Sequence, residues 1–174
     1  MPEWLHGLEA WHDFYVFAGT AAATLVGLMF VVAALGQRSL ATEEGSRATR
    51  ALFTPIVVFF VSVIVVSMLM LIPGTAPSTL GALLAALAAG GLIYMFASGA
   101  LTFWRNSQLG FDDLAWYVAL PYVGYAAIGA AAAEIWKASA LGLYIAAASM
   151  ILLLLIGIRN AWDLVVYSVR QTGD

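Results

Sequence analysis

Five long apolar stretches, each without Asp, Glu, Lys, Arg or His, follow one another along the chain. They cover residues 14–36, 51–72, 78–104, 114–133 and 138–158. A helix needs about 20 apolar residues to cross roughly 30 Å of hydrocarbon, and every stretch meets that length. The pattern predicts an all-α fold, a polytopic bundle of five transmembrane helices that forms one domain. The alternative has four spans, with the third or fourth helix re-entrant.

The composition agrees with lipid as the solvent of this chain. Apolar residues make up 63% and charged residues 10%, against roughly 45–50% and roughly 25% in soluble domains. The chain has no cysteine, which excludes disulfides, thiolate metal sites and cysteine nucleophiles. The net charge is −3 and no basic patch is present, so nucleic acid is not an expected partner.

The segment before the first span contains Glu3, Glu9 and Asp13 and no Lys or Arg. A secretory signal peptide is positively charged there and has a shorter apolar core, so we expect the first span to be retained. The apolar residues between these charges predict a short amphipathic helix at about residues 2–12, lying in the membrane interface.

The same segment contains His6, Glu9 and His12. Two histidines and a carboxylate are ligand types for a transition metal, but their spacing is not that of a known zinc motif. We therefore predict no metal site and no cofactor. A metal-dependent membrane enzyme built on these three residues is a third alternative for the function.

Charge tests the five spans independently of hydropathy. With five spans, one side of the membrane holds the first link, the third link and the C-terminus. That side carries Arg38, Arg47, Arg50, Arg105, Arg159 and Arg170, and the other side carries Lys137. The positive-inside rule places the arginines in the cytoplasm, so the N-terminus is predicted to lie outside. All six tryptophans fall at or just beyond span ends, where interfacial residues are expected.

Small residues recur at every fourth position of the first span, at Gly19, Ala23 and Gly27, with Thr20 and Thr24 beside them. Helices in lipid associate through such residues because two backbones can then approach closely. We predict a helix-packing surface here, within the chain or between chains; contact with a ligand is a further alternative. The third and fourth spans are also rich in small residues, whereas the second is built of large ones. We therefore expect the second span to face lipid and the first, third and fourth spans to form the packed centre.

Pro121 lies within the fourth span and frees a carbonyl one turn earlier, which predicts a kink in that helix. Tyr117 and Tyr125 share one helix face beside it. A packed kink with Tyr117 near the membrane interface is the expected arrangement. The alternative is an aromatic wall of a pore, or of a pocket for a lipid or a quinone.

Arg159 and Asp163 follow the fifth span and are four residues apart. This spacing allows them to pair on one face of a helix, at the cytoplasmic edge of the membrane. Because Arg159 directly follows an apolar run, it must reach the interface or find a partner. An interfacial ion pair is the expected role, and a polar latch to another protein or to the first link is the alternative.

Residues 11–16 read Trp-His-Asp-Phe-Tyr-Val, residues 19–31 hold the small-residue pattern described above, and residues 158–163 read Ile-Arg-Asn-Ala-Trp-Asp. These segments resemble the opening and the close of a group of small, functionally uncharacterised bacterial integral membrane proteins. The resemblance covers the first and last helices. It implies a multi-pass protein of the bacterial inner (cytoplasmic) membrane, and it implies no activity and no functional residue.

No ionisable residue falls near the middle of any predicted span, although proton relays and ion-coupled transporters need such groups. No residue pattern indicates a catalytic site. We therefore predict a protein that is not an enzyme and serves as an accessory, scaffolding or regulatory subunit of a larger membrane assembly. Its expected partners are the lipid bilayer and another membrane protein or further copies of itself. The alternative is a homo-oligomeric channel or passive permeation pathway.

The orientation can be tested with single cysteines, since the chain has none of its own. Gly45→Cys lies in the first link, predicted to be cytoplasmic, and Ser139→Cys lies in the link predicted to be external. In intact cells, a membrane-impermeant thiol reagent should label the Ser139→Cys variant and not the Gly45→Cys variant. The opposite labelling would reverse the orientation.

Overall fold

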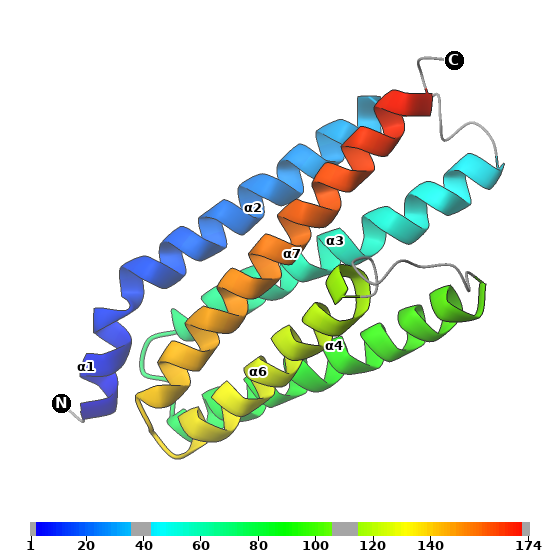
Figure 1. The fold of residues 1–174 in the computed structure, drawn as a ribbon. Helices are drawn as coiled ribbons and strands as arrows, with labels where there is room; N and C mark the ends of the chain where they lie inside the picture. Colours follow the sequence, from blue (N-terminus) through cyan, green and yellow to red (C-terminus); the bar gives the residue numbers. More distant parts are fainter. Residues whose placement is uncertain (1–2, 36–42, 106–114, 172–174) are drawn as a thin grey trace.

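Five helices that are long and apolar enough to cross a membrane follow one another in the computed structural model, which describes residues 3–35, 43–105 and 115–171 (Figure 1). They are α2 (His12–Leu35), α3 (Glu43–Met70), α4 (Pro77–Arg105), η2 (Ala115–Ala119) continued by α6 (Leu120–Trp136), and α7 (Leu141–Gln171), and the short α1 (Glu3–Ala10) precedes them. The predicted all-α bundle with five spans is confirmed. The predicted helix ends at residues 2, 36 and 114 lie outside the described residues.

The α3 and α7 helices form the centre of the bundle. The α3 helix packs on α2 and α7, the α7 helix also packs on α6, and α4 packs along α6. The α2 and α4 helices therefore lie at opposite edges, as Figure 1 shows. Half of the residues in the α7 span are buried, against 17% in the α2 span. Each edge helix thus presents most of its surface to lipid.

The expectation that the second span, α3, faces lipid is wrong, and so is the expectation that the first and third spans, α2 and α4, lie at the packed centre. Its large side chains Ile56, Phe59, Phe60 and Val63 are at most 1% exposed. They are buried because small residues of the neighbouring helices leave room for them. The Phe60 ring lies so close to Gly157 of α7 that a Cβ on this glycine would overlap the ring. In such a contact one helix contributes small residues, and the other contributes the large side chains that pack against them. A run of large apolar residues therefore fits a central helix.

Other helix pairs meet in the same way. A Cβ added to Gly124 of α6 would lie 2.8 Å from Leu153 Cδ2 of α7. A Cβ on Gly91 of α4 would overlap the ring of Tyr125 of α6. In lipid, dispersion contacts of this kind hold helices together, because an apolar side chain gains nothing by leaving one hydrocarbon environment for another.

Of the small-residue row predicted on α2, only the first member, Gly19, lies in the contact with α3. A Cβ added to Gly19 would lie 2.8 Å from Ser67 Cβ of α3, but none of the described atoms lies within 4 Å of a Cβ added to Gly27. Residues four apart rotate by about 40° around a helix, so the row turns away from the neighbouring helix. The buried face of α2 instead holds Tyr15, Ala18, Ala22 and Met29.

Two short turns close the bundle at the end that holds the N-terminus (Figure 1). Gly74, between α3 and α4, has a φ of 70°, and Pro77 begins α4, where its missing N–H removes no helical hydrogen bond. After α6, Ala138 has a φ of 57°. The Ser139 N–H donates to the Glu134 carbonyl at 3.0 Å. This is the Schellman pattern, which ends a helix sharply and turns the chain directly into α7.

At the other end, α3 and α7 extend past their predicted spans of 51–72 and 138–158. The α7 helix has 31 residues, which at 1.5 Å per residue corresponds to about 46 Å. The hydrocarbon layer is roughly 30 Å thick. The added turns hold charged residues, Glu43 to Arg50 in α3 and Asp163 to Arg170 in α7. They therefore belong to the water-facing side of the interface.

Two glycines of α4 provide a matched test of the packing. A Cβ added to Gly81 would lie 2.8 Å from the Ala132 carbonyl oxygen of α6, whereas none of the described atoms lies within 4 Å of one added to Gly90. Gly81→Ala should lower the free energy of unfolding in detergent by roughly 1–3 kcal/mol. Gly90→Ala should leave it unchanged or raise it by about 0.5–1 kcal/mol, because alanine favours helix. Equal melting temperatures would contradict the contact between α4 and α6.

Candidate functional site

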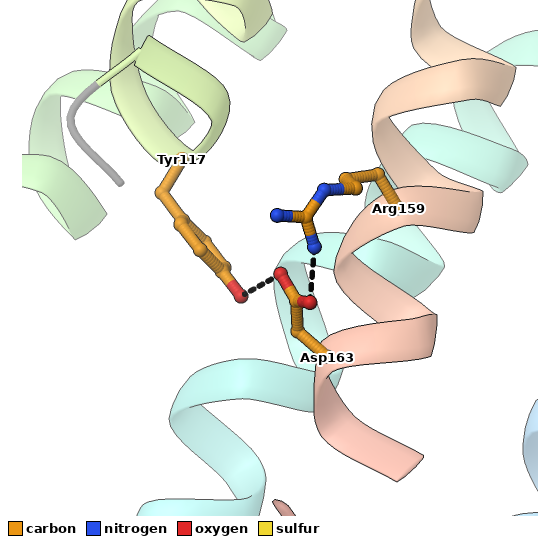
Figure 2. Close-up of polar contacts among 3 residues, drawn as sticks. All are labelled: Tyr117, Arg159 and Asp163. Carbon is orange, nitrogen blue, oxygen red and sulfur yellow. Dashed lines mark hydrogen bonds and ion pairs between the residues drawn. The ribbon is translucent and has the colours of Figure 1, made fainter. Parts of the chain in front are cut away.

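A polar cluster joins η2 to α7. The Arg159 guanidinium donates to one carboxylate oxygen of Asp163, and the Tyr117 hydroxyl donates to the other, Oδ2, at 3.3 Å (Figure 2). The same guanidinium lies 5.9 Å from the centre of the Trp116 ring, within range of a cation–π interaction. The predicted pairing of Arg159 with Asp163 is therefore part of a cluster that connects two spans.

The fourth span supplies this cluster from a π-helical segment. The η2 segment holds Trp116 and Tyr117 and passes directly into α6. Pro121 is the second residue of α6 and is buried, in the first turn of a helix, where a missing N–H is tolerated. The sequence predicted an irregularity at this proline, and the structure has a change of helix type just before it. Short π segments are rare and occur often at functional sites.

Sequence analysis overlooked Asn160. Its side chain lies one turn before Asp163 on α7 and is 2% exposed, and Oδ1 has no hydrogen-bond partner among the described residues. Ser67 Oγ of α3 is a second buried oxygen without a partner there, and leaving such an oxygen unpaired costs roughly 1–3 kcal/mol. The available signal was its place between Arg159 and Asp163, which we interpreted only as an ion pair.

Tyr125 lies in the core of the bundle, away from Tyr117. Its ring is 0% exposed and lies 6.4 Å from that of Phe59, measured between centroids. Its hydroxyl shares a 2.9 Å hydrogen bond with Ser62 of α3. Tyr117 contacts α7 instead. The two tyrosines therefore do not form one aromatic wall, and the pore or quinone alternative has no support from Tyr125.

Most of the predicted small-residue surface on α2 faces outward. We call Thr20, Ala23, Thr24 and Gly27 the outer face of α2, and all four are exposed. Packing of this face within the chain is therefore wrong. Both threonine hydroxyls donate to carbonyls one turn earlier in their own helix, at 2.8 and 2.9 Å. The outer face therefore presents small side chains, and the hydroxyl hydrogens of both threonines are already bonded within α2.

The N-terminal histidines lie apart from these sites. His6 Nδ1 is 3.7 Å from Glu9 Oε2 on α1, and both side chains are more than 60% exposed. His12 and Asp13 are exposed at the start of α2. Over the ranges that the structure describes, no three His, Cys, Asp or Glu residues are grouped closely enough to hold a metal ion.

The cluster of η2 and α7 can bind polar groups of either sign, since it combines a guanidinium and a carboxylate. The outer face of α2 can accept another helix. No protein-family model, no curated protein and no solved structure matches the chain. These two surfaces and their chemistry are therefore the features that indicate a function for the chain.

The buried tyrosine gives a test of packing against pocket. Tyr125→Ala should lower the free energy of unfolding by roughly 3–5 kcal/mol, because a ring that fills the core is removed. Tyr125→Phe should cost only about 1 kcal/mol, since Ser62 also has a 2.8 Å hydrogen bond to the Val58 carbonyl. Thermal unfolding in one detergent measures both variants. Wild-type melting of Tyr125→Ala would mean that the ring lines an open space.

Proposed function

We propose that this protein is an accessory, scaffolding or regulatory subunit of a larger membrane assembly. The observation that carries the proposal is the outer face of α2, a flat surface of small side chains on the least buried span of the bundle. The chemistry of its lipid environment explains why such a face favours a partner.

A lipid chain and a second helix compete for the outer face of α2. A helix gains by binding there because small side chains allow close backbone contact over several turns. The open space around Gly27 and the internally bonded Thr20 and Thr24 suit such an approach. The outer face is flanked by large residues of α2 such as Phe17 and Phe30, which are 74% and 62% exposed. Their side chains can pack against the two sides of a partner helix.

The alternative is a homo-oligomeric channel lined by the same face. A water-filled pore needs polar groups or exposed backbone along its full depth. On α2 the two threonine hydroxyls donate their hydrogens to their own helix, and the neighbouring residues Ala23 and Gly27 are apolar. This arrangement favours packing over conduction.

We place the protein in the bacterial inner membrane, with the N-terminus outside and the C-terminus in the cytoplasm. The six arginines on one side of the five spans support this orientation. The resemblance of the first and last helices to small bacterial membrane proteins supports the compartment. With this orientation the protruding ends of α3 and α7 lie in the cytoplasm, where they can contact a soluble region of the same assembly.

Two matched variants test the proposed partner surface. Ala23 on α2 and Ala148 on α7 are both exposed alanines, and each is replaced by leucine. Native isolation in mild detergent, followed by mass measurement, should give a complex with a foreign membrane protein. Ala23→Leu should reduce recovery of that partner about tenfold, which corresponds to about 1.4 kcal/mol, and Ala148→Leu should leave it unchanged.

Other outcomes would decide against the proposal. Single-channel currents from purified protein in planar bilayers, changed in size by Thr24→Val, would establish the channel. An ion-tight homo-oligomer without a foreign partner would contradict both functions. Equal loss of the partner in Ala23→Leu and Ala148→Leu would mean that the outer face of α2 is not the contact.

A further inference from the structure

The cluster of η2 and α7 has the chemistry of a ligand site, independently of the proposed function. We propose that it binds the head group of a zwitterionic aminophospholipid, which carries a phosphate and a primary ammonium group. The site consists of Trp116, Tyr117, Arg159 and Asp163. We call these four residues the head-group site.

The head-group site lies at the depth of lipid head groups. Arg159 and Asp163 occupy the last turn of the apolar span Leu141–Asp163, and Trp162 between them is 65% exposed, as is usual for an interfacial anchor. The side chains of Arg159 and Asp163 are 44% and 32% exposed. Both charged groups can therefore be reached by a lipid lying against α7 without unfolding of the bundle.

The charges of the site favour a zwitterion over an ion of one sign. An anionic head group attracted by Arg159 would be repelled by Asp163, and a cation would meet the reverse. A phosphate and an ammonium on one short chain can satisfy both residues at once. The guanidinium binds phosphate oxygens with directed N–H groups, and it lies over the Trp116 ring, which restricts its position.

The carboxylate of the site is held weakly by one of its donors. The bond from Tyr117 to Asp163 measures 3.3 Å, against about 2.7–2.8 Å for a typical O–H···O bond, so it can be displaced at low cost. A primary ammonium supplies three donors, and one of them can replace the Tyr117 hydroxyl on Asp163.

The number of N–H donors distinguishes two abundant lipid head groups. Ethanolamine ends in a primary ammonium with three N–H donors, whereas choline is trimethylated and has none. Both carry the phosphate that Arg159 would bind. The acceptor Asp163 therefore selects between them, and Arg159 does not. A preference for ethanolamine over choline lipids is the measurable consequence.

The experiment uses the purified full-length chain and native mass spectrometry. Phosphatidylethanolamine, phosphatidylcholine and phosphatidylglycerol with identical acyl chains are added separately. The wild type should bind phosphatidylethanolamine roughly tenfold more tightly than the other two, as expected for hydrogen bonds to charged groups. Asp163→Asn should abolish the preference over phosphatidylcholine. Arg159→Gln should weaken binding of both of these lipids, because both carry the phosphate.

A second ion pair of the chain provides the control. Glu134 pairs with Lys137 at 2.8 Å at the opposite end of α6, so Glu134→Gln should leave the lipid preference unchanged. Thermal unfolding in lipid-free detergent identifies any variant that fails to fold, and Asp163→Ser then replaces Asp163→Asn as the test of the acceptor. Equal affinities of the wild type for the three lipids, tighter binding of phosphatidylglycerol, or an unchanged preference in Asp163→Asn would each overturn the proposal.

Discussion

The arrangement of the bundle depends on large side chains of one helix inserting beside glycines of the next. Phe60 against Gly157 joins the two central helices, α3 and α7. Leu153 against Gly124 then fixes α6 on α7, and Tyr125 against Gly91 fixes α4 on α6. Each contact requires a missing Cβ on one side, so these contacts set the distance between neighbouring helices. The edge helix α4 is placed through this series, whereas the edge helix α2 packs directly on α3.

Polar groups inside the bundle are constrained by the same lipid environment, because water cannot compensate for an unpaired group. Ser62 is bonded both to its own helix and to Tyr125, and Ser149 donates to the Ala146 carbonyl at 2.7 Å. Tyr15 donates across the bundle to the Leu143 carbonyl. Among the described residues, Ser67 Oγ and Asn160 Oδ1 are the two buried side-chain atoms without a hydrogen-bond partner.

The parts of the fold that hydropathy determines were predictable from sequence. Apolar length gave the five spans, and a spacing of four gave the contact of Arg159 with Asp163, since both depend on residues near one another in the chain. The choice of central helix did not follow. In a membrane, large apolar side chains are about equally stable on the lipid-facing surface and inside the bundle. The composition of α3 therefore does not show which helices are its neighbours. That choice depends on which glycine lies opposite each ring, as Gly157 does for Phe60.

The short α6–α7 hairpin bears on how the chain enters the membrane. Its two helices are joined by a tight turn. In the orientation proposed above, the two helices enter together and the turn crosses the hydrocarbon with its charges. Glu134 and Lys137 lie beside this turn and pair at 2.8 Å, so the segment that crosses carries no net charge. The ion pair thereby lowers the electrostatic barrier to translocation during biogenesis.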